Sequence, residues 1–130
     1  MADIEVHLVT VERELWTGRA QMVVARTVNG DIGVLAGHAP LLAQLREGFA
    51  ARIVGTDGEV FGVAVHGGFL SVTRNGVVIL AEDAQLSDEI DVTQARETYE
   101  LAKSHGGDST DAQRELRRAQ AQLLAVGHQV

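Results

Sequence analysis

The sequence predicts an α+β chain: an N-terminal antiparallel β-sandwich followed by a C-terminal antiparallel two-helix hairpin. Apolar residues alternate with a period of two up to about residue 87 and follow a helical period after it. Of the 14 glycines, all but Gly106, Gly107 and Gly127 precede that point. We therefore expect two domains, a β-sandwich over residues 1–86 and a helical hairpin over residues 87–130.

The pattern of residues 1–86 predicts several short strands separated by tight turns. The β-rich runs cover residues 4–8, 20–25, 62–65, 69–72 and 77–81. Three Asn-Gly or Asp-Gly dipeptides separate such runs, at residues 29–30, 57–58 and 75–76, and we expect positive φ at both residues of each. Because some strands are apolar on both faces, a closed two-layer sandwich is favoured over one open sheet.

The second part predicts two helices. The first should cover residues 92–104, because Asp91 followed by Gln94 resembles a capping box. The second should cover residues 111–126 and end at Gly127, where a left-handed terminator belongs.

Two further features shape the expected hairpin. Residues 105–107, His-Gly-Gly, should stop the first helix and turn the chain, and Thr110 should cap the second helix. The apolar stripes that would join the helices contain mainly small side chains: Ala95, Thr98, Tyr99 and Ala102, and Ala112, Leu116, Ala119 and Leu123. Since alanine buries little area, we expect a hairpin that can detach from the sandwich, with an ordinary two-helix cap as the alternative.

Composition argues against several classes of function. The chain carries 18 acidic and 11 basic residues, for a net charge of −7, which disfavours nucleic acid and anionic lipid as partners. It has no cysteine, which removes thiol chemistry and disulfides. We also expect no secretory signal, because the N-terminus lacks a basic start and an apolar run, and no membrane-spanning segment, since no run approaches 18 apolar residues.

A search for catalytic motifs indicates that the chain is not an enzyme. It contains neither a nucleophile elbow nor a phosphate-binding loop, and the glycines at residues 67–68 favour a bulge or close backbone packing. A zinc site would need three or four ligands. His38 and His66, with Asp31 or Asp57, are the one candidate set, and ordinary hydrogen-bonded histidines are the favoured interpretation.

Three blocks of sequence resemble a known family. Residues 30–42 read Gly-Asp-Ile-Gly-Val-Leu-Ala-Gly-His-Ala-Pro-Leu-Leu, and residues 67–72 read Gly-Gly-Phe-Leu-Ser-Val. Residues 75–82 follow as Asn-Gly-Val-Val-Ile-Leu-Ala-Glu. Together with residues 9–18, these blocks resemble the epsilon subunit of bacterial F-type ATP synthases. Ala36 departs from the family pattern, where many members have proline.

The resemblance implies a rotor subunit of the central stalk without catalytic residues. The sandwich would couple the gamma subunit to the c ring during proton-driven ATP synthesis. Asp31 matches an acidic position that faces the c ring, and Gly37 and His38 lie in the adjoining contact loop. The subunit would sit peripherally on the cytoplasmic face of the bacterial cell membrane.

The resemblance also implies that the helical hairpin inhibits ATP hydrolysis. Arg114, Arg117 and Arg118 would contact the alpha and beta catalytic subunits. A solvated helix face, with these arginines paired to Glu115 and Asp111, is the open alternative.

Some members of the family bind ATP in the hairpin, which makes Asp91 and Arg118 a candidate nucleotide site here. Gln94 and Gln122 stand in this sequence where two family arginines would contact phosphate. Since glutamine lacks the charge that offsets phosphate, we expect weak ATP binding or none, and no cofactor. Two other functions remain as alternatives to the rotor subunit: a stand-alone ligand-binding sandwich with a helical tail, and a small metalloenzyme using His38 and His66.

Overall fold

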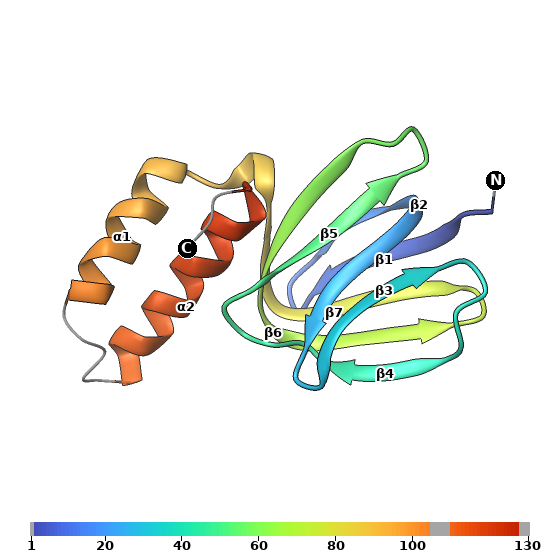
Figure 1. Cartoon of the computed structure of the whole chain (residues 1–130), viewed down its shortest axis with the longest axis horizontal. Helices are drawn as coiled ribbons and strands as arrows, with labels where there is room; N and C mark the ends of the chain where they lie inside the picture. The colour runs from blue at the N-terminus through green and yellow to red at the C-terminus, as the bar shows by residue number, and fades with distance from the viewer. Residues whose placement is uncertain (1, 105–109, 128–130) are drawn as a thin grey trace.

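The computed structural model describes residues 2–104 and 110–127, and Figure 1 shows a body of strands with two helices along one side. The strands are β1 (Ile4–Thr10), β2 (Glu14–Thr27), β3 (Gly30–Leu35), β4 (Leu41–Gln44), β5 (Ala50–Gly55), β6 (Val60–Thr73) and β7 (Gly76–Leu86). A short 3-10 turn, η1 (Ser87–Glu89), leads to α1 (Val92–Ser104) and α2 (Thr110–Ala125).

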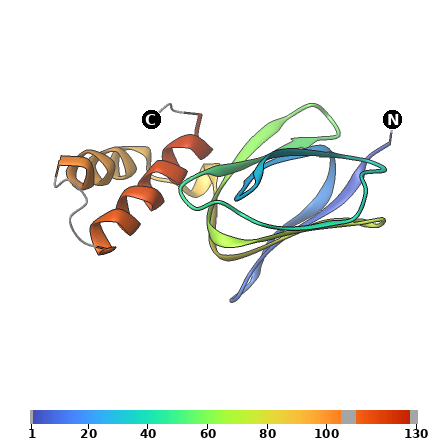
Figure 2. The same ribbon diagram turned by 60° about the horizontal axis from the view of Figure 1, so that its bottom comes forward.

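The seven strands form one sheet that folds over and closes on itself. Its strand order is β1-β7-β6-β5-β2-β3, β4 pairs with β6, and β1 also pairs with β2. The two longest strands, β2 and β6, have 14 residues each and take part in both layers. Figure 2 shows these layers with the helices at one end. The predicted sandwich followed by two helices is confirmed.

One strand pair departs from the expected antiparallel pattern. Strands β1 and β7 run parallel, with Val6 beside Val77 and Leu8 beside Ile79. They are the first and last strands of the sandwich. Because the whole sandwich connects them, no tight hairpin dictates their direction.

Strand β6 changes neighbours at two glycines. Its first half pairs with β5 and its second half with β4. Between them, Gly67 and Gly68 have φ of +80° and +139°, values that disfavour any side chain. A Cβ on Gly68 would also overlap the carbonyl oxygen of Leu80 on β7. Of the two predicted reasons for this pair, close backbone packing is found at Gly68.

The three predicted hairpin turns form, but their backbone differs from the expectation. Among the described residues, no residue other than glycine has positive φ, so the asparagines and the aspartate of the dipeptides do not adopt it. In the β2–β3 turn the Thr27 hydroxyl donates to the carbonyl oxygen of Gly30 and accepts from the amide of Asn29. The β6–β7 turn repeats this arrangement from Thr73. The threonine hydroxyl therefore closes the turn and only the glycine takes the left-handed conformation.

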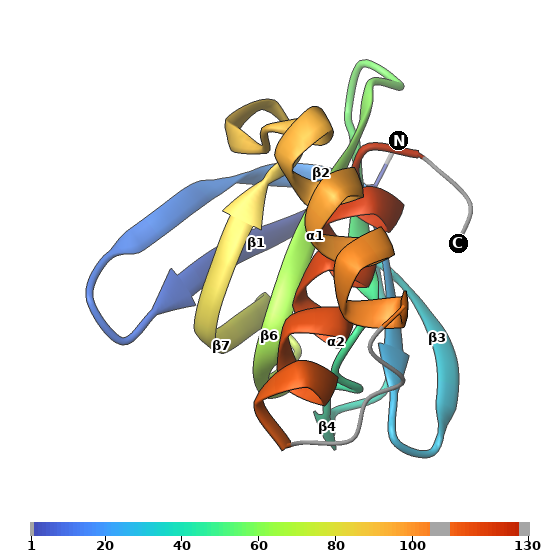
Figure 3. The same cartoon turned by 90° about the vertical axis from the view of Figure 1, so that its left-hand side faces the viewer.

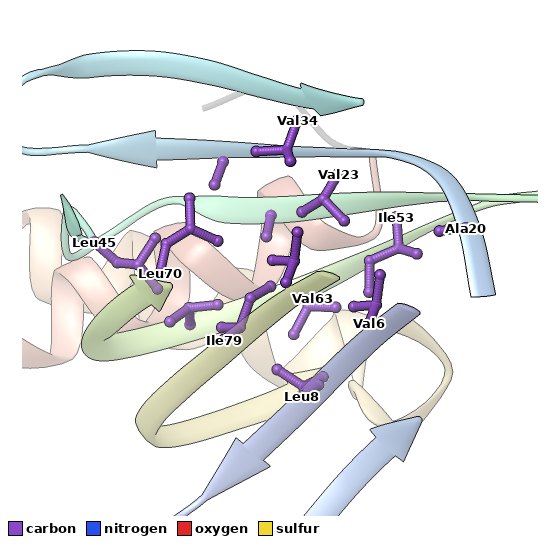
Figure 4. Packing of buried hydrophobic residues seen from close by; sticks show 14 of the residues in the cluster. Val6, Leu8, Ala20, Val23, Val34, Leu45, Ile53, Val63, Leu70 and Ile79 are labelled. Carbon is purple, nitrogen blue, oxygen red and sulfur yellow. The ribbon is translucent and has the colours of Figure 1, made fainter. Parts of the chain in front are cut away.

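Aliphatic side chains fill the space between the layers, as the composition predicts. Figure 4 shows Leu8, Ile53, Leu70 and Ile79 pointing into this core, and all four are fully buried. Aromatic rings stay at its edge, where Trp16 meets Phe61 with centroids 5.1 Å apart.

The helices agree closely with the sequence prediction. Helix α1 has the predicted bounds, and the Asp91 carboxylate accepts a hydrogen bond from the amide of Gln94 at 3.1 Å. Helix α2 begins and ends one residue earlier than predicted, so Thr110 is its first residue and the prediction that it caps the helix is wrong. Gly127 follows with φ of +89°, as expected for a terminator. The predicted turn at residues 105–107 lies outside the described residues.

The hairpin packs on the sandwich through α2. Figures 1 and 3 show α2 between α1 and the strands β5 and β6. The strands end at Leu86, where the sequence predicts the boundary between domains 1–86 and 87–130. Independent folding of the two segments stays a prediction.

Candidate functional site

Helix α2 presents one face to α1 and another to the sandwich. Of the predicted stripes, Ala95 and Ala102 on α1 and Ala119 and Leu123 on α2 are buried. The stripe toward the sandwich carries Arg117, Arg118, Ala121 and Ala125, which recur at helical spacing. Its apolar part forms a second small core with Ala64, Ile90, Ala95 and Leu123.

Glycine lets α2 approach the sandwich closely at two points. Gly62 on β6 lies against the last turn of α2, and a Cβ there would overlap the carbonyl oxygen of Ala125. Gly48, with φ of +87°, lies under Arg117 and Gln120. The Gln120 side chain donates to the Gly48 carbonyl oxygen at 2.7 Å. Any larger side chain at Gly62 would push the helix outward.

Two ion pairs hold the arginine stripe to the sandwich. Arg117 contacts Glu47 at 3.0 Å and Arg118 contacts Asp83 at 2.8 Å. All four side chains are about half exposed, so each pair contributes at most about 1 kcal/mol. Together with Arg117 and Arg118, Arg114 lines a hollow between α2 and the sandwich. It has no ion pair among the described residues. The alternative of pairing with Glu115 and Asp111 is not observed for Arg117 and Arg118, because their helix face is turned toward the sandwich.

The candidate nucleotide residues meet in a hollow of about 410 Å³ between the helices and the end of β7. Asp91 and Arg118 both line it, so the structure brings them together. Arg118, however, is directed to Asp83, and the Gln122 amide donates to the Gln85 side chain at 2.6 Å. The other charged residues lining the hollow are acidic, Glu89 and Glu115. This lining offers one engaged arginine and no second cation for a triphosphate.

The candidate c-ring residues lie toward opposite ends of β3. Asp31 stands near the start of β3, exposed, with one carboxylate oxygen 3.4 Å from Arg26. Gly37, with φ of +87°, and His38 follow the end of the strand, and the imidazole Nδ1 lies 2.7 Å from the carbonyl oxygen of Ala39. About 13 Å of strand separates Asp31 from Leu35, so a partner touching both ends must be extended.

The sequence did not predict a second surface, an exposed apolar area on the sheet. On the outer face of the sheet, Leu42, Phe69, Val78 and Leu80 are 36–70% exposed. Phe69 is paired with Leu80, and Ser71 lies between Leu42 and Val78, so these side chains share one face. We call them the outer patch. The signal in the sequence is the unbroken apolar run of residues 77–81, where alternation would place polar residues on a solvated face.

The histidines do not assemble a metal site among residues 2–104 and 110–127, where no group of three or more potential ligands is found. His66 lies in the hollow beneath α2, whereas His38 lies in the β3–β4 loop. His7 hydrogen-bonds Glu5 and Glu14 on the exposed face of β1. Its contact with Glu14, followed by that with Glu5, raises the pKa of the imidazole.

Comparison with known proteins gives one family. A family model described as ATP synthase, Delta/Epsilon chain, beta-sandwich domain matches residues 3–87. The chain is 48% identical to the ATP synthase epsilon chain of Nocardia farcinica over 124 residues, covering 95% of this chain and 90% of the relative. It is 48% identical to that of Streptomyces avermitilis over 125 residues, covering 96% of each chain. For the Mycobacterium sp. strain KMS protein the identity is 43%, over 98% of each chain.

Two solved structures share the fold. A chain in the cryo-EM structure of the Euglena gracilis mitochondrial ATP synthase, OSCP/F1/c-ring, aligns with a TM-score of 0.79 and 25% identity, covering 98% of this chain and 83% of that one. A chain in the central stalk and c-ring structure of the Tetrahymena thermophila mitochondrial ATP synthase aligns with a TM-score of 0.56 and 19% identity, over 73% and 71%. The second likeness shows the fold alone.

The glycine contact yields a direct test of helix docking. In Gly62→Ala, the overlap with Ala125 should weaken docking by about 1–3 kcal/mol. Protection of α2 amides against hydrogen exchange should then fall by about fivefold or more. Gly33→Ala is the matched control, because the nearest atom to its new Cβ is the Met22 sulfur at 3.8 Å. Unchanged α2 protection in Gly62→Ala would contradict the docked geometry.

The hollow between the helices predicts poor nucleotide binding. Calorimetric titration of the full chain with ATP should show no saturation below about 1 mM. The double variant Gln94→Arg/Gln122→Arg should bind at least about tenfold more tightly, because each charged hydrogen bond contributes about 1.5–3 kcal/mol. Micromolar binding by the unaltered chain would contradict the prediction.

Proposed function

Because the chain belongs to the ATP synthase delta/epsilon family, we propose that it couples the gamma subunit to the c ring in the central stalk of a bacterial F-type ATP synthase and restrains ATP hydrolysis through its hairpin. The observation that carries this proposal is the likeness to bacterial epsilon chains over nearly the whole length, helices included. Like its relatives, the chain is a non-catalytic subunit.

The outer patch is the surface that we assign to gamma. Leu42, Phe69, Val78 and Leu80 form a contiguous apolar area on a sheet face, and such areas on soluble domains mark protein contacts. Phe69 is the largest of the four and lies opposite Leu80, which suits it to anchor the interface.

The region around β3 is the surface that we assign to the c ring. The Asp31 carboxylate is exposed, with Arg26 on one side, and can accept further hydrogen bonds from donors on the ring. Gly37 and His38 extend this contact at the other end of β3, beside the exposed Leu35. Exposed ion pairs are individually weak, so torque transfer depends on the shape and number of contacts.

The hairpin is proposed to act as a brake with two positions. In the docked position, ion pairs to Glu47 and Asp83 engage Arg117 and Arg118. In a detached position these arginines and Arg114 become available to acidic segments of the alpha and beta subunits. Because docking depends on alanine methyls and half-exposed ion pairs, a difference of a few kcal/mol between the positions is sufficient.

We place the subunit peripherally, on the cytoplasmic face of the cell membrane. Neither of the described helices has the length and apolar character needed to cross a bilayer. The family's place in a membrane-associated complex supports this assignment.

The brake is tested by ATP hydrolysis of the reconstituted complex, with the full chain and with a chain ending at Asp88. Truncation should raise hydrolysis by about fivefold or more, the lower end of a typical coupling of 1–3 kcal/mol. Retention of gamma, alpha and beta during purification is the control for assembly. Equal hydrolysis with both chains would remove the inhibitory role and leave the structural one.

The gamma contact is tested in the outer patch. Phe69→Glu should weaken assembly with gamma by more than about 2 kcal/mol, or about 30-fold, because it buries a charge at the centre of the patch. Val60→Glu is the matched control, since Val60 is 54% exposed outside the patch. Normal co-purification of Phe69→Glu with gamma would reject the assignment, and failure of the unaltered chain to co-purify would favour a stand-alone ligand-binding module.

A further inference from the structure

His66 occupies an unusual position under α2. It stands on β6 opposite Asp83, in the part of the strand that α2 covers. Its Nε2 atom is buried and has no hydrogen-bond partner among the described residues. An unpaired imidazole nitrogen at a docking interface costs free energy unless burial of the rest of the interface compensates.

Charged groups surround this imidazole on three sides. The hollow beneath α2 has a volume of about 500 Å³. It is lined, besides His66 and Gly48, by Arg114, Arg117 and Arg118 of α2, by Glu82 and Asp83 of β7, and by Glu47 of the β4–β5 connection. Since Arg117 and Arg118 already engage Glu47 and Asp83, a second positive charge at His66 would compete with the arginines for the same carboxylates.

The docked helix favours the neutral imidazole. Burial lowers the pKa of His66 from its ordinary value of 6.5, and the Arg118 guanidinium lowers it further. Asp83, Gln85 and Glu47 oppose this shift, without reversing it. The Arg118 effect comes from the docked position of α2, and detachment of the helix would carry this guanidinium away and open the hollow around the ring to water.

We propose that His66 is a proton-sensitive release for the hairpin, such that protonation of its half-buried imidazole detaches α2 from the sandwich. This inference rests on the proposed function, in which the hairpin has a docked and a detached position. It adds the condition that moves the hairpin: a fall in pH favours the detached, inhibitory position.

The direction follows from proton linkage. A group whose pKa is lower in the docked state binds its proton more readily in the detached state, so acid favours detachment. Docking of α2 should not depend on protonation of His66 well above pH 6.5. It should weaken as the pH falls through 6.5. Each unit of difference between the docked and detached pKa values changes the docking equilibrium by up to about tenfold.

The test uses energy transfer within the full chain, which has no native cysteine to interfere with labelling. Dyes are attached through Val11→Cys on the sandwich and Ser104→Cys on α1, both at exposed positions. The efficiency of energy transfer between the two dyes should fall as the pH is lowered from 8.0 to 5.5, because the hairpin moves away from the sandwich. His66→Gln should abolish this change, and His7→Gln, which removes an exposed imidazole far from α2, should retain it. Fluorescence of the single Trp16 checks that the sandwich stays folded.

A proton titration by NMR supplies an independent reading. The His66 ring in the full chain should titrate below 6.5, and in Gly62→Ala, where docking is weakened, closer to 6.5. A titration at or above 6.5 in the docked chain would overturn the proposal, as would a pH response of transfer that persists in His66→Gln.

The Gly62→Ala variant separates this inference from the function on which it rests. If Gly62→Ala shows low transfer at pH 8.0 while the unaltered chain does not respond to pH, the hairpin detaches and His66 is not its release. If neither acid nor Gly62→Ala lowers transfer, the hairpin does not detach, and the proposed brake fails together with this inference.

Discussion

The path of β6 is the constraint on which the other features depend. Its first half supports α2, and its second half carries Phe69 on the outer patch. The change between them occurs at Gly67 and Gly68, whose positive φ disfavours side chains, and at Gly68 the Leu80 carbonyl also leaves no room for one. The same 14-residue strand therefore holds a regulatory contact at one end and a partner-binding surface at the other, so movement of the hairpin need not disturb the surface assigned to gamma.

The docking of α2 combines close approach with low binding energy. Glycine at positions 48 and 62 lets the helix backbone come near the strands, and alanines fill the remaining space. Close packing of small groups specifies one position accurately, whereas each methyl contributes only about 0.8 kcal/mol. Polar contacts at the rim, such as Arg118 with Asp83, add orientation and remain open to water and salt. A regulatory element needs this balance between defined geometry and ready release.

At the candidate nucleotide site, contacts with neighbouring residues determine whether the polar side chains are available to a ligand. The hollow between the helices has enough volume for a small ligand, and Asp91 and Arg118 line it. Gln122 donates to Gln85 across one side, and Arg118 is directed to Asp83. Polar groups thus satisfy one another where a phosphate-binding site would leave cations available. In this chain, the same arginine stabilises docking of the helix and is withdrawn from ligand binding.

The sequence by itself determined the succession of a β-sandwich and two helices, the three hairpin turns and the aliphatic core, because these follow from local periodicity and from glycine, whereas it missed β5 and divided β6 into two runs. The alternation of Ile4, Val6 and Leu8 and the cap at Asp91 are examples that needed no tertiary information. The tertiary structure decided that β1 pairs in parallel with β7, that Arg117 and Arg118 face the sandwich, and that the Nε2 atom of His66 is buried without a partner beneath α2. Each of these contacts joins residues at least 30 positions apart, except within the sheet pair of His66 and Asp83. Local patterns carry no record of such contacts, since they arise only when the sheet closes and the helix docks.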